Sequence, residues 1–343
     1  MKKIICSVIQ NPPSDWGVWR KVVDREKYLK FEGEFPVNAY FCDSVLNAEP
    51  NFEKIEILGR IGSPSADAEV YRIKFMGIEF AMKLMPRIDS DSSARNQNEI
   101  STAIEASQYP EHFPITFAYG YCSDSKYYKS SQRDDNERSP FIPKAIEYSI
   151  INKILNSISS KHLKKRFDSD YRNGMSITEL KSKYKSEEHY IEDGTIQVDF
   201  LISELANGDL GNWMTEERSI SEWKKVLIDV MTGIYYLTTQ LKVVHPDLHP
   251  GNVLILKDNE LKALIHDFGR CYPIEEGVEE MNKATLLSFT SEFINCSNRD
   301  DLMVPREILA IVQDINRSVE KERITMDNIQ SIYENLIFPI ISY

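Results

Sequence analysis

Two short polar segments in the second half of the chain carry residues that could do chemistry together. They are residues 245–252 (HPDLHPGN) and 266–269 (HDFG). Moving the terminal phosphoryl group of a nucleotide requires a carboxylate that takes the proton of the acceptor hydroxyl, and metal ions that neutralise the phosphates. Asp247 would be that carboxylate, while Asn252 and Asp267 offer the hard oxygen ligands that Mg²⁺ prefers. The pattern therefore predicts a phosphotransferase site.

A short hairpin should bring the two segments together. Residues 253–256 and 261–265 are apolar and suited to strands, and the polar residues 257–260 between them are typical of a turn. Because the two ends of a hairpin lie side by side, Asn252 and Asp267 would meet. The structural alternative is that the polar residues only form turns and helix caps.

These residues resemble the catalytic loop and D-F-G motif of the protein-kinase superfamily, in which H-R-D-x-x-x-x-N precedes D-F-G. The resemblance implies an α+β, bilobal protein-kinase-like fold with a small β-rich N-lobe and a mainly helical C-lobe. It also implies an ATP-dependent kinase with Mg²⁺ as its metal ion and Mn²⁺ as the alternative. Asn252 and Asp267 would be the metal ligands.

Upstream segments match the nucleotide-binding parts of that family in order. Residues 57–71 resemble a degraded glycine-rich loop, in which Gly62 sits best on the motif. A hairpin turn at Met76-Gly77 leads into residues 80–85 (FAMKLM), which match the V-A-I-K strand. Lys83 would then contact the α- and β-phosphates, and a solvent-facing strand lysine is the alternative. The resemblance assigns further nucleotide contacts to Gly62, Ser63, Val70 and Ala81.

A helix is predicted over residues 94–106, because its apolar residues are spaced for one buried face. Glu99 lies beside that face and is the expected ion-pair partner of Lys83. Glu105 is the competing candidate. The structural alternative is an exposed helix glutamate.

Residues 196–210 fit the strand and hinge that join the two lobes of such a fold. Backbone groups from Glu204 to Ala206 would face the adenine, and Leu254 would contribute a further nucleotide contact. Gly208-Asp209-Leu210 resembles the G-D-L that opens the first helix of the C-lobe. Residues 223–237 then repeat apolar side chains at helical spacing and predict a core helix.

The expected organisation has three parts. Residues 1–50 form an N-terminal extension whose aromatic content indicates packing on the kinase; 51–205 form the N-lobe; and 206–343 form the C-lobe. The fourth strand is expected over 112–121, whereas the hinge strand begins only near Ile196. An insert of about residues 123–195 therefore separates the fourth and fifth strands, and the apolar spacing of 143–163 makes it helical.

The acceptor is less clearly specified than the reaction. His249 stands where typical serine/threonine kinases have a lysine that meets the transferred phosphate. It could donate a hydrogen bond to the phosphate or only hold the loop. The letters D-L-H-P-G-N also resemble the aminoglycoside and choline phosphotransferases, whose acceptors are small molecules. We favour an atypical protein serine/threonine kinase of viral or bacterial-effector type, with a small-molecule kinase as the alternative and a pseudokinase scaffold as the third reading.

The segment after Gly269 lacks an A-P-E sequence, and residues 282–294 already have a helical pattern. The activation segment is therefore expected to be short. Pro246 replaces the arginine that commonly binds an activation-loop phosphate, so activity should not depend on such a phosphate.

Composition limits the partners and the compartment. A net charge of −12 argues against nucleic acid as the main partner, because binding a polyanion needs a basic excess. The five widely spaced cysteines predict reduced thiols in the cytoplasm, which is the host cytoplasm for a viral or effector protein. No apolar run is long enough to span a membrane. Protein substrates or small-molecule acceptors are the expected partners, and the sequence leaves the oligomeric state open.

Overall fold

The computed structural model describes residues 25–32, 55–61, 68–87, 90–124, 167, 170, 196–257, 260–275, 277–297, 299 and 301–342. They fall into two compact units. The first unit contains the described residues within 1–32, 97–116 and 203–343, and the second contains those within 33–96 and 117–202. Among the described residues, no helix has the length and apolar character needed to cross a membrane.

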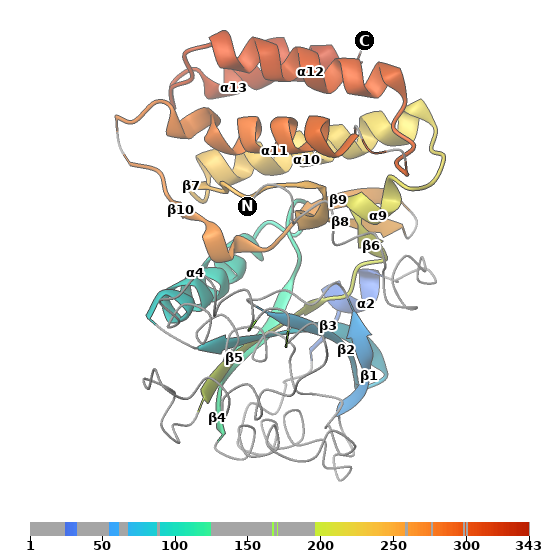
Figure 1. Ribbon diagram of the computed structural model, residues 1–343, viewed down its shortest axis with the longest axis vertical. Coiled ribbons are helices and arrows are strands. Elements are labelled where there is room, and N and C mark those ends of the chain that lie inside the picture. Colours follow the sequence, from blue (N-terminus) through green and yellow to red (C-terminus); the bar gives the residue numbers. More distant parts are fainter. Residues whose placement is uncertain are drawn as a thin grey trace. The chain divides into compact units, whose positions relative to one another are not determined.

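A five-stranded sheet with the order β1-β2-β3-β5-β4 makes up most of the second unit (Figure 1). The strands are β1 (Ile55–Ile61), β2 (Glu69–Phe75), β3 (Ile78–Arg87), β4 (Thr116–Asp124) and β5 (Ile196–Glu204). The predicted turn at Met76-Gly77 is confirmed, with φ of 49° and 79°. Two successive positive φ angles match the twist of a tight antiparallel hairpin.

The β2–β3 hairpin sorts its side chains onto two faces. Directly opposed residues, such as Val70 and Lys83, share a face, and side chains alternate along each strand. The buried face is apolar and consists of Tyr71, Ile73, Phe75, Phe80, Met82 and Leu84. Val70, Ala81 and Lys83 therefore lie together on the other face.

Helix α4 (Ser90–Ala106) begins four residues earlier than the sequence predicts. Its first turns are held by Asn96, whose Nδ2 donates to the carbonyl oxygen of Met85 and to Oδ2 of Asp199, both at 2.9 Å. Arg87 also donates two bonds of 2.6 Å to Asp199. These contacts join α4, β3 and β5 within the second unit.

The predicted hairpin in the first unit is confirmed as β8 (Val253–Lys257) and β9 (Leu261–Ile265), with β6 (Gly208–Asp209) beside β8. The core helix predicted over 223–237 is α10 (Ile220–Thr239), which begins at a capping box made by Ser219 and Glu222. It packs closely on β9. A Cβ atom added to Gly233 would lie 2.9 Å from Cδ1 of Ile265.

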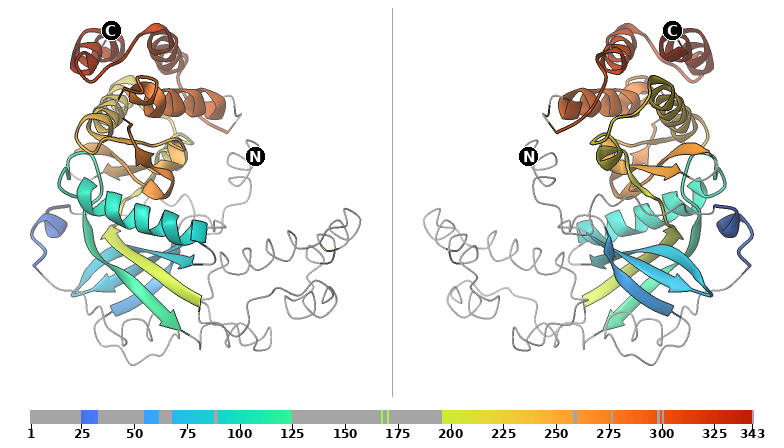
Figure 2. Two further views of the ribbon diagram at one scale, coloured as in Figure 1. Left: turned by 90° about the vertical axis from the view of Figure 1, so that its left-hand side faces the viewer. Right: turned by 90° about the vertical axis from the view of Figure 1, so that its right-hand side faces the viewer.

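The other elements of the first unit lie both before and after the hairpin in the sequence. Helices α10, α11 and α12 contact one another and form the stacked layers in Figure 2. The elements are α2 (Arg25–Leu29), α9 (Leu210–Trp213), β7 (Val243–Val244), β10 (Tyr272–Pro273), α11 (Met281–Ser297), α12 (Arg306–Lys321), α13 (Ile329–Ile332), a π-helical turn Tyr333–Ile337 and α14 (Phe338–Ser342). The predicted helix at 282–294 is thus confirmed as part of α11.

The fourth strand starts later than predicted, at Thr116 rather than His112. The reason is that the carbonyl oxygen of His112 accepts the N–H of Ile265 at 3.0 Å, which places this segment against the end of β9. The β-rich N-terminal region and helical C-terminal region confirm the predicted α+β class. Most of the predicted insert 123–195, including its helix at 143–163, lies outside the described residues.

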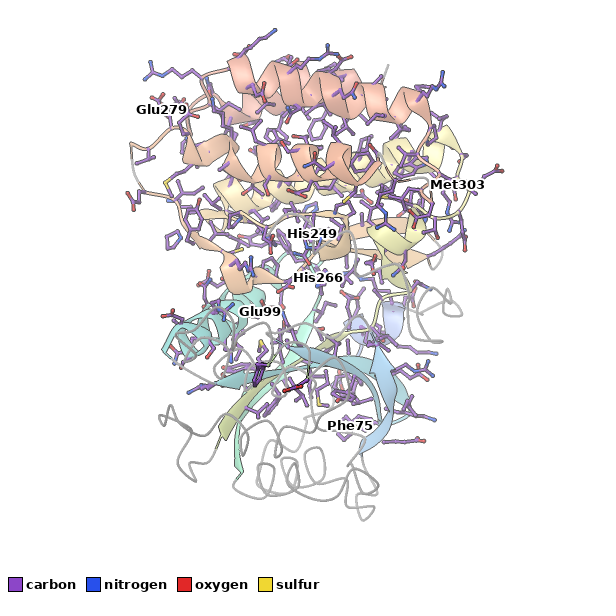
Figure 3. The ribbon with its side chains drawn as sticks, in the orientation of Figure 1. Phe75, Glu99, His249, His266, Glu279 and Met303 are labelled. Atoms are coloured by element: carbon purple, nitrogen blue, oxygen red, sulfur yellow. The ribbon has the colours of Figure 1, made fainter. Side chains whose placement is uncertain are left out.

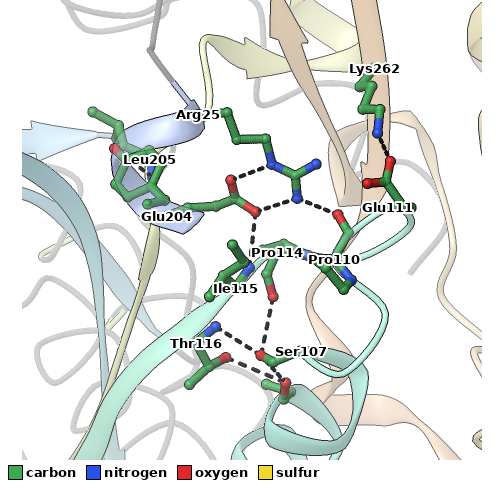
Figure 4. Close-up of polar contacts among 12 residues, drawn as sticks. Arg25, Ser107, Pro110, Glu111, Pro114, Ile115, Thr116, Glu204, Leu205 and Lys262 are labelled. Carbon is green, nitrogen blue, oxygen red and sulfur yellow. Dashed lines mark hydrogen bonds and ion pairs between the residues drawn. The ribbon is translucent and has the colours of Figure 1, made fainter. Parts of the chain in front are cut away.

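Part of the predicted N-terminal extension is described, namely residues 25–32. Its helix α2 contacts the end of β5. Arg25 pairs with the buried carboxylate of Glu204 and also donates to the carbonyl oxygen of Pro110 (Figure 4). The hydroxyl oxygen of Tyr28 accepts the N–H of Leu205 at 3.3 Å. Packing of the other residues of 1–50 stays a prediction.

Candidate active site

The loop that carries Asp247 is shaped by bonds within its own eight residues. Nδ2 of Asn252 donates to the carbonyl oxygen of Asp247 at 2.9 Å, and the N–H of Asn252 donates to the carbonyl oxygen of His249 at 2.8 Å. A 3₁₀ turn over Pro250–Asn252 closes the loop. Because Pro250 has a fixed φ, it suits the first position of that turn. Asp247 precedes this turn, and its side chain is 30% exposed.

The metal-ligand candidates Asn252 and Asp267 are brought together by the β8–β9 register. Val253 pairs with Ile265, and the N–H of His266 donates to the carbonyl oxygen of Asn252 at 3.1 Å, so Asp267 follows directly. Because Nδ2 of Asn252 is engaged by the loop, its Oδ1 is the atom suited to a metal ion. An amide oxygen and a carboxylate match the hard ligands of Mg²⁺.

No group of three or more His, Cys, Asp or Glu residues in the described part of the chain could hold a metal ion by itself. A metal ion that arrives with a nucleotide needs fewer protein ligands, because phosphate oxygens and water complete its shell. The pair Asn252 and Asp267 fits that kind of site. Its role as the metal site stays a prediction.

Asp267 has a left-handed backbone, with φ 66° and ψ 65°. Such a conformation is costly for a residue with a side chain, and it persists where the surroundings impose it, often at functional sites. Phe268 is one source of that constraint. Its ring is 2% exposed and lies edge-on to Phe113, with ring centroids 6.0 Å apart.

Three histidines surround the loop, and two of them contact the backbone of Gly251. Nδ1 of His249 accepts the Gly251 N–H at 3.1 Å, and Nε2 of His266 lies 3.2 Å from the Gly251 carbonyl oxygen (Figure 3). His245 is fully buried, and its Nε2 lies 3.2 Å from the carbonyl oxygen of His266. Burial lowers the pKa of His245, which keeps it neutral. The histidines thus connect the loop to the D-F-G segment.

His249 holds the loop in this structure. Burial lowers its pKa although the nearby carboxylates of Asp247 and Asp267 act in the opposite direction. The imidazole is therefore neutral near pH 7, and its Nδ1 serves as the cap of the 3₁₀ turn. Of the two roles considered from the sequence, the observed contact is the loop-holding one.

Arg270 is a site residue that the sequence analysis missed. Its Nη1 lies 3.4 Å from Oδ2 of Asp247, and its side chain is 52% exposed. The turn that carries it is closed by the N–H of Cys271, which donates to the carbonyl oxygen of Phe268 at 2.9 Å. The position of an arginine directly after the D-F-G letters was the available signal.

The helix that carries Glu99 is attached to the same segment. Nδ2 of Asn98 donates to the carbonyl oxygens of Phe268 and Cys271. Glu99 is 3% exposed, whereas Glu105 is exposed to solvent, so burial favours Glu99 over its competitor. The carboxylate of Glu99 also helps to raise the pKa of the buried Cys271 thiol, after the larger effect of burial. The ion pair of Glu99 with Lys83 stays a prediction.

The hinge candidates are partly engaged by the protein itself. The side chain of Glu204 is fully buried. The backbone N–H of Glu204 donates to the carbonyl oxygen of Ile115 at 2.9 Å. The N–H of Leu205 donates to Tyr28. Ala206 lies in an apolar cluster with Leu256 and Leu264, against which Leu254 packs. The structure therefore brings Ala206 and Leu254 together.

The candidates of the second unit can be placed only in part. Val70, Ala81 and Lys83 share the half-buried face of the β2–β3 hairpin, as the register requires. Gly62 and Ser63 lie outside the described residues. Their predicted contacts with phosphate stay predictions.

Asp209, which begins α9, was noted in the sequence only as part of G-D-L. Its carboxylate accepts the N–H of Asn212 at 2.8 Å and Nδ2 of the same residue at 2.7 Å. Loss of surrounding water raises the pKa of Asp209 to about 6, against the lowering effect of those bonds. The bonds to Asn212 make Asp209 the N-cap of α9.

Comparison with known proteins gives an independent indication. A model described as the protein kinase domain matches residues 156–298. The 3-phosphoinositide-dependent protein kinase 1 of Caenorhabditis elegans is 34% identical over 100 residues, which are 27% of this chain and 15% of that protein. The mitosis inhibitor protein kinase SWE1 of Saccharomyces cerevisiae is 23% identical over 184 residues, which are 51% of this chain and 20% of that protein. The matches thus cover a fifth or less of either relative.

Proposed function

Because this chain is a member of the protein-kinase-like superfamily, we propose that it transfers the γ-phosphoryl group of ATP to serine or threonine hydroxyls of proteins. One observation carries the proposal. The bond from Nδ2 of Asn252 to the carbonyl oxygen of Asp247 fixes the expected base and the expected metal ligand in one turn. The β8–β9 register then adds Asp267 to them.

In this proposal Asp247 accepts the proton of the acceptor hydroxyl as the oxygen attacks phosphorus. Its carboxylate is partly exposed, so an acceptor can reach it. Asn252 and Asp267 would hold Mg²⁺, which neutralises charge on the phosphates when it is bound. Mn²⁺ is the alternative ion. His249 keeps the turn closed through Gly251, so that the other side chains stay in place.

The nucleotide contacts in this proposal are those that the kinase resemblance assigns. Lys83 would contact the phosphates, with Glu99 as its ion-pair partner, while Gly62, Ser63, Val70 and Ala81 would form the remaining surface. Ala206 and Leu254, which lie in and against one apolar cluster, support a flat apolar surface for the adenine. Backbone groups of the hinge from Glu204 to Ala206 would bind its edge, except the N–H groups of Glu204 and Leu205, which already donate to Ile115 and Tyr28.

The choice of a protein acceptor rests on the comparisons, since both curated relatives are named as protein kinases. The activation segment of this proposal is short, because α11 begins at Met281, soon after Arg270. The proposed compartment is the cytoplasm. The buried thiols of Cys271 and Cys296, which form no disulfide, support a reducing environment.

The same early start of α11 favours a second candidate function. A short segment between Gly269 and Met281 leaves little chain to build a groove for a substrate peptide. A small hydroxylic molecule would need no such groove. Phosphorylation of a small molecule, as in the aminoglycoside and choline phosphotransferases, is therefore the alternative.

The deciding experiment measures transfer of labelled phosphate from ATP, with Mg²⁺, to a panel of proteins and to a panel of small hydroxylic compounds. Wild type is compared with Asp247→Asn and with Asp314→Asn, a control on the exposed side of α12. Labelled protein supports the proposal, and labelling of small compounds alone supports the alternative. No transfer at all identifies a pseudokinase scaffold.

The Asp247→Asn variant tests the site itself. Loss of a positioned base should reduce the rate by about 10²- to 10⁴-fold. Asp314→Asn should match wild type. An Asp247→Asn protein with the wild-type rate would overturn the site assignment.

A further inference from the structure

The carboxylate of Asp247 is paired with a cation that no sequence motif assigns. Nη1 of Arg270 lies 3.4 Å from its Oδ2. This distance is an ion pair rather than a short hydrogen bond, and a guanidinium has five N–H donors in a planar fork. A guanidinium can therefore contact a carboxylate and a phosphoryl oxygen at the same time.

The backbone around Arg270 is held by hydrogen bonds. Cys271 closes the 3₁₀ turn Phe268–Arg270 by donating its N–H to Phe268. Asn98 of α4 donates to both carbonyl oxygens that flank Arg270 along the turn. The side chain is nevertheless 52% exposed, so a ligand can reach the guanidinium.

His249 is engaged by the loop in this structure. Its Nδ1 accepts the N–H of Gly251 at 3.1 Å and caps the 3₁₀ turn Pro250–Asn252. The cation observed beside the base is Arg270.

We propose that Arg270 is a catalytic residue that binds the phosphoryl group during its transfer, in place of a cation on the Asp247 loop. This inference rests on the phosphotransferase function proposed above. As the acceptor oxygen bonds to the γ-phosphorus, the bond from that phosphorus to the β,γ-bridging oxygen breaks, ADP leaves, and the acceptor proton passes to Asp247. The guanidinium neutralises charge on the phosphoryl oxygens and stays beside the protonating carboxylate.

A different role would have a different signature. An arginine that only covers Asp247 in the resting protein would block the acceptor, and its removal would raise the rate. If Arg270 only orients the carboxylate of Asp247, a free cation added to the solution would not restore the activity of a variant that lacks the arginine. Charge stabilisation of the transferred group lowers the barrier itself, so its loss appears in kcat.

The experiment compares Arg270→Ala and Arg270→Lys with wild type in the labelled-ATP assay, using the acceptor that the wild-type protein phosphorylates. Arg270→Ala should lower kcat by about 10³- to 10⁵-fold, as for other arginines that contact a transferred phosphoryl group. The KM for ATP should change far less. Arg270→Lys should retain more activity than Arg270→Ala because it keeps the charge. Guanidinium chloride at millimolar concentration should restore part of the activity of Arg270→Ala.

Arg317→Ala is the matched control, since Arg317 is an exposed arginine on α12 that pairs with Asp314. It should show wild-type kcat and no response to guanidinium. Melting temperatures check that Arg270→Ala is folded. A wild-type kcat, a raised kcat, or a loss confined to KM in Arg270→Ala overturns this inference while the proposed function stands. A wild-type protein that transfers no phosphate overturns both.

Discussion

Arg25 and Glu204 lie 179 residues apart in the sequence and form a two-bond ion pair, with Nε to Oε2 and Nη2 to Oε1 both at 2.9 Å. The Glu204 side chain is fully buried, and its Oε1 also accepts the N–H of Ile115 at 2.9 Å. The pair therefore joins helix α2, the end of β5 and the start of β4 at the proposed hinge.

Removing the guanidinium should destabilise the protein strongly. Arg25→Ala would leave the Glu204 carboxylate buried without its counter-charge, which typically costs about 3 to 5 kcal/mol. Urea denaturation measures this change in the free energy of unfolding. The double variant Arg25→Ala/Glu204→Gln should recover part of the loss, because glutamine is uncharged and can still accept the N–H of Ile115.

Lys30→Ala is the control, because Lys30 directly follows the same helix and pairs with Glu26 at the surface, with side chains 75% and 64% exposed. Surface pairs contribute little to stability. Equal free energies of unfolding for Arg25→Ala and Lys30→Ala would show that the buried pair does not stabilise this region.

Two substitutions can distinguish whether His249 holds the loop or binds the phosphate. Asparagine is a favoured cap and can accept the N–H of Gly251, as Nδ1 of His249 does at 3.1 Å. We expect His249→Asn to keep much of the wild-type kcat and His249→Ala to lose more. Steady-state kinetics with one acceptor measure both. If the imidazole instead binds the phosphate directly, the two variants will lose activity equally.

Asn252 should affect metal dependence and loop geometry in different ways. Asn252→Ala removes both Oδ1 and the Nδ2 bond to Asp247, so we expect a higher Mg²⁺ concentration at half-maximal rate and a lower kcat. Asn252→Asp keeps an oxygen ligand but places a carboxylate against the carbonyl oxygen of Asp247. It should lose kcat with a smaller change in Mg²⁺ dependence.

Asn335→Ala provides the comparison for Asn252, because Nδ2 of Asn335 only bonds to Ser331 in an exposed turn. Its Mg²⁺ titration should match wild type. A wild-type titration for Asn252→Ala as well would rule out Asn252 as a metal ligand.

Activity should not require phosphorylation after the D-F-G segment. Tyr272 has the only hydroxyl side chain between Arg270 and Asn282, and it is 41% exposed. Pro246 stands where an arginine would bind such a phosphate, and a proline side chain offers no donor. Tyr272→Phe and phosphatase-treated wild type should both retain the full rate. A loss of rate in both would show a requirement for phosphotyrosine.

The sequence was sufficient where the pattern is local. The β8–β9 hairpin follows from two apolar runs around a polar turn, and its register alone places Asp267 beside Asn252. Helical spacing on α4 also explains why Glu99 is buried whereas Glu105 is exposed. Such features depend on neighbours within a few residues, which periodicity records.

The rest depends on residues that meet only in the folded chain. Arg25 and Arg270 belong neither to a periodic apolar pattern nor to a turn motif. The sequence around them therefore does not indicate that they pair with Glu204 and Asp247. The neutrality of His249 depends on burial by surrounding side chains, because the carboxylates near it would alone favour the charged form. From the sequence alone, only the ordinary pKa of a histidine can be assumed, because the burial that lowers it arises in the folded protein.

The link between α2 and β5 also affects how the chain reaches its native state. During synthesis, Arg25 leaves the ribosome long before Glu204, which is 179 residues further on. Closing a loop of that length costs entropy before the contact forms, and long-range contacts slow folding. The hinge can therefore acquire its final support only late in translation. A fragment that begins at β1 would fold with the buried Glu204 lacking its counter-ion.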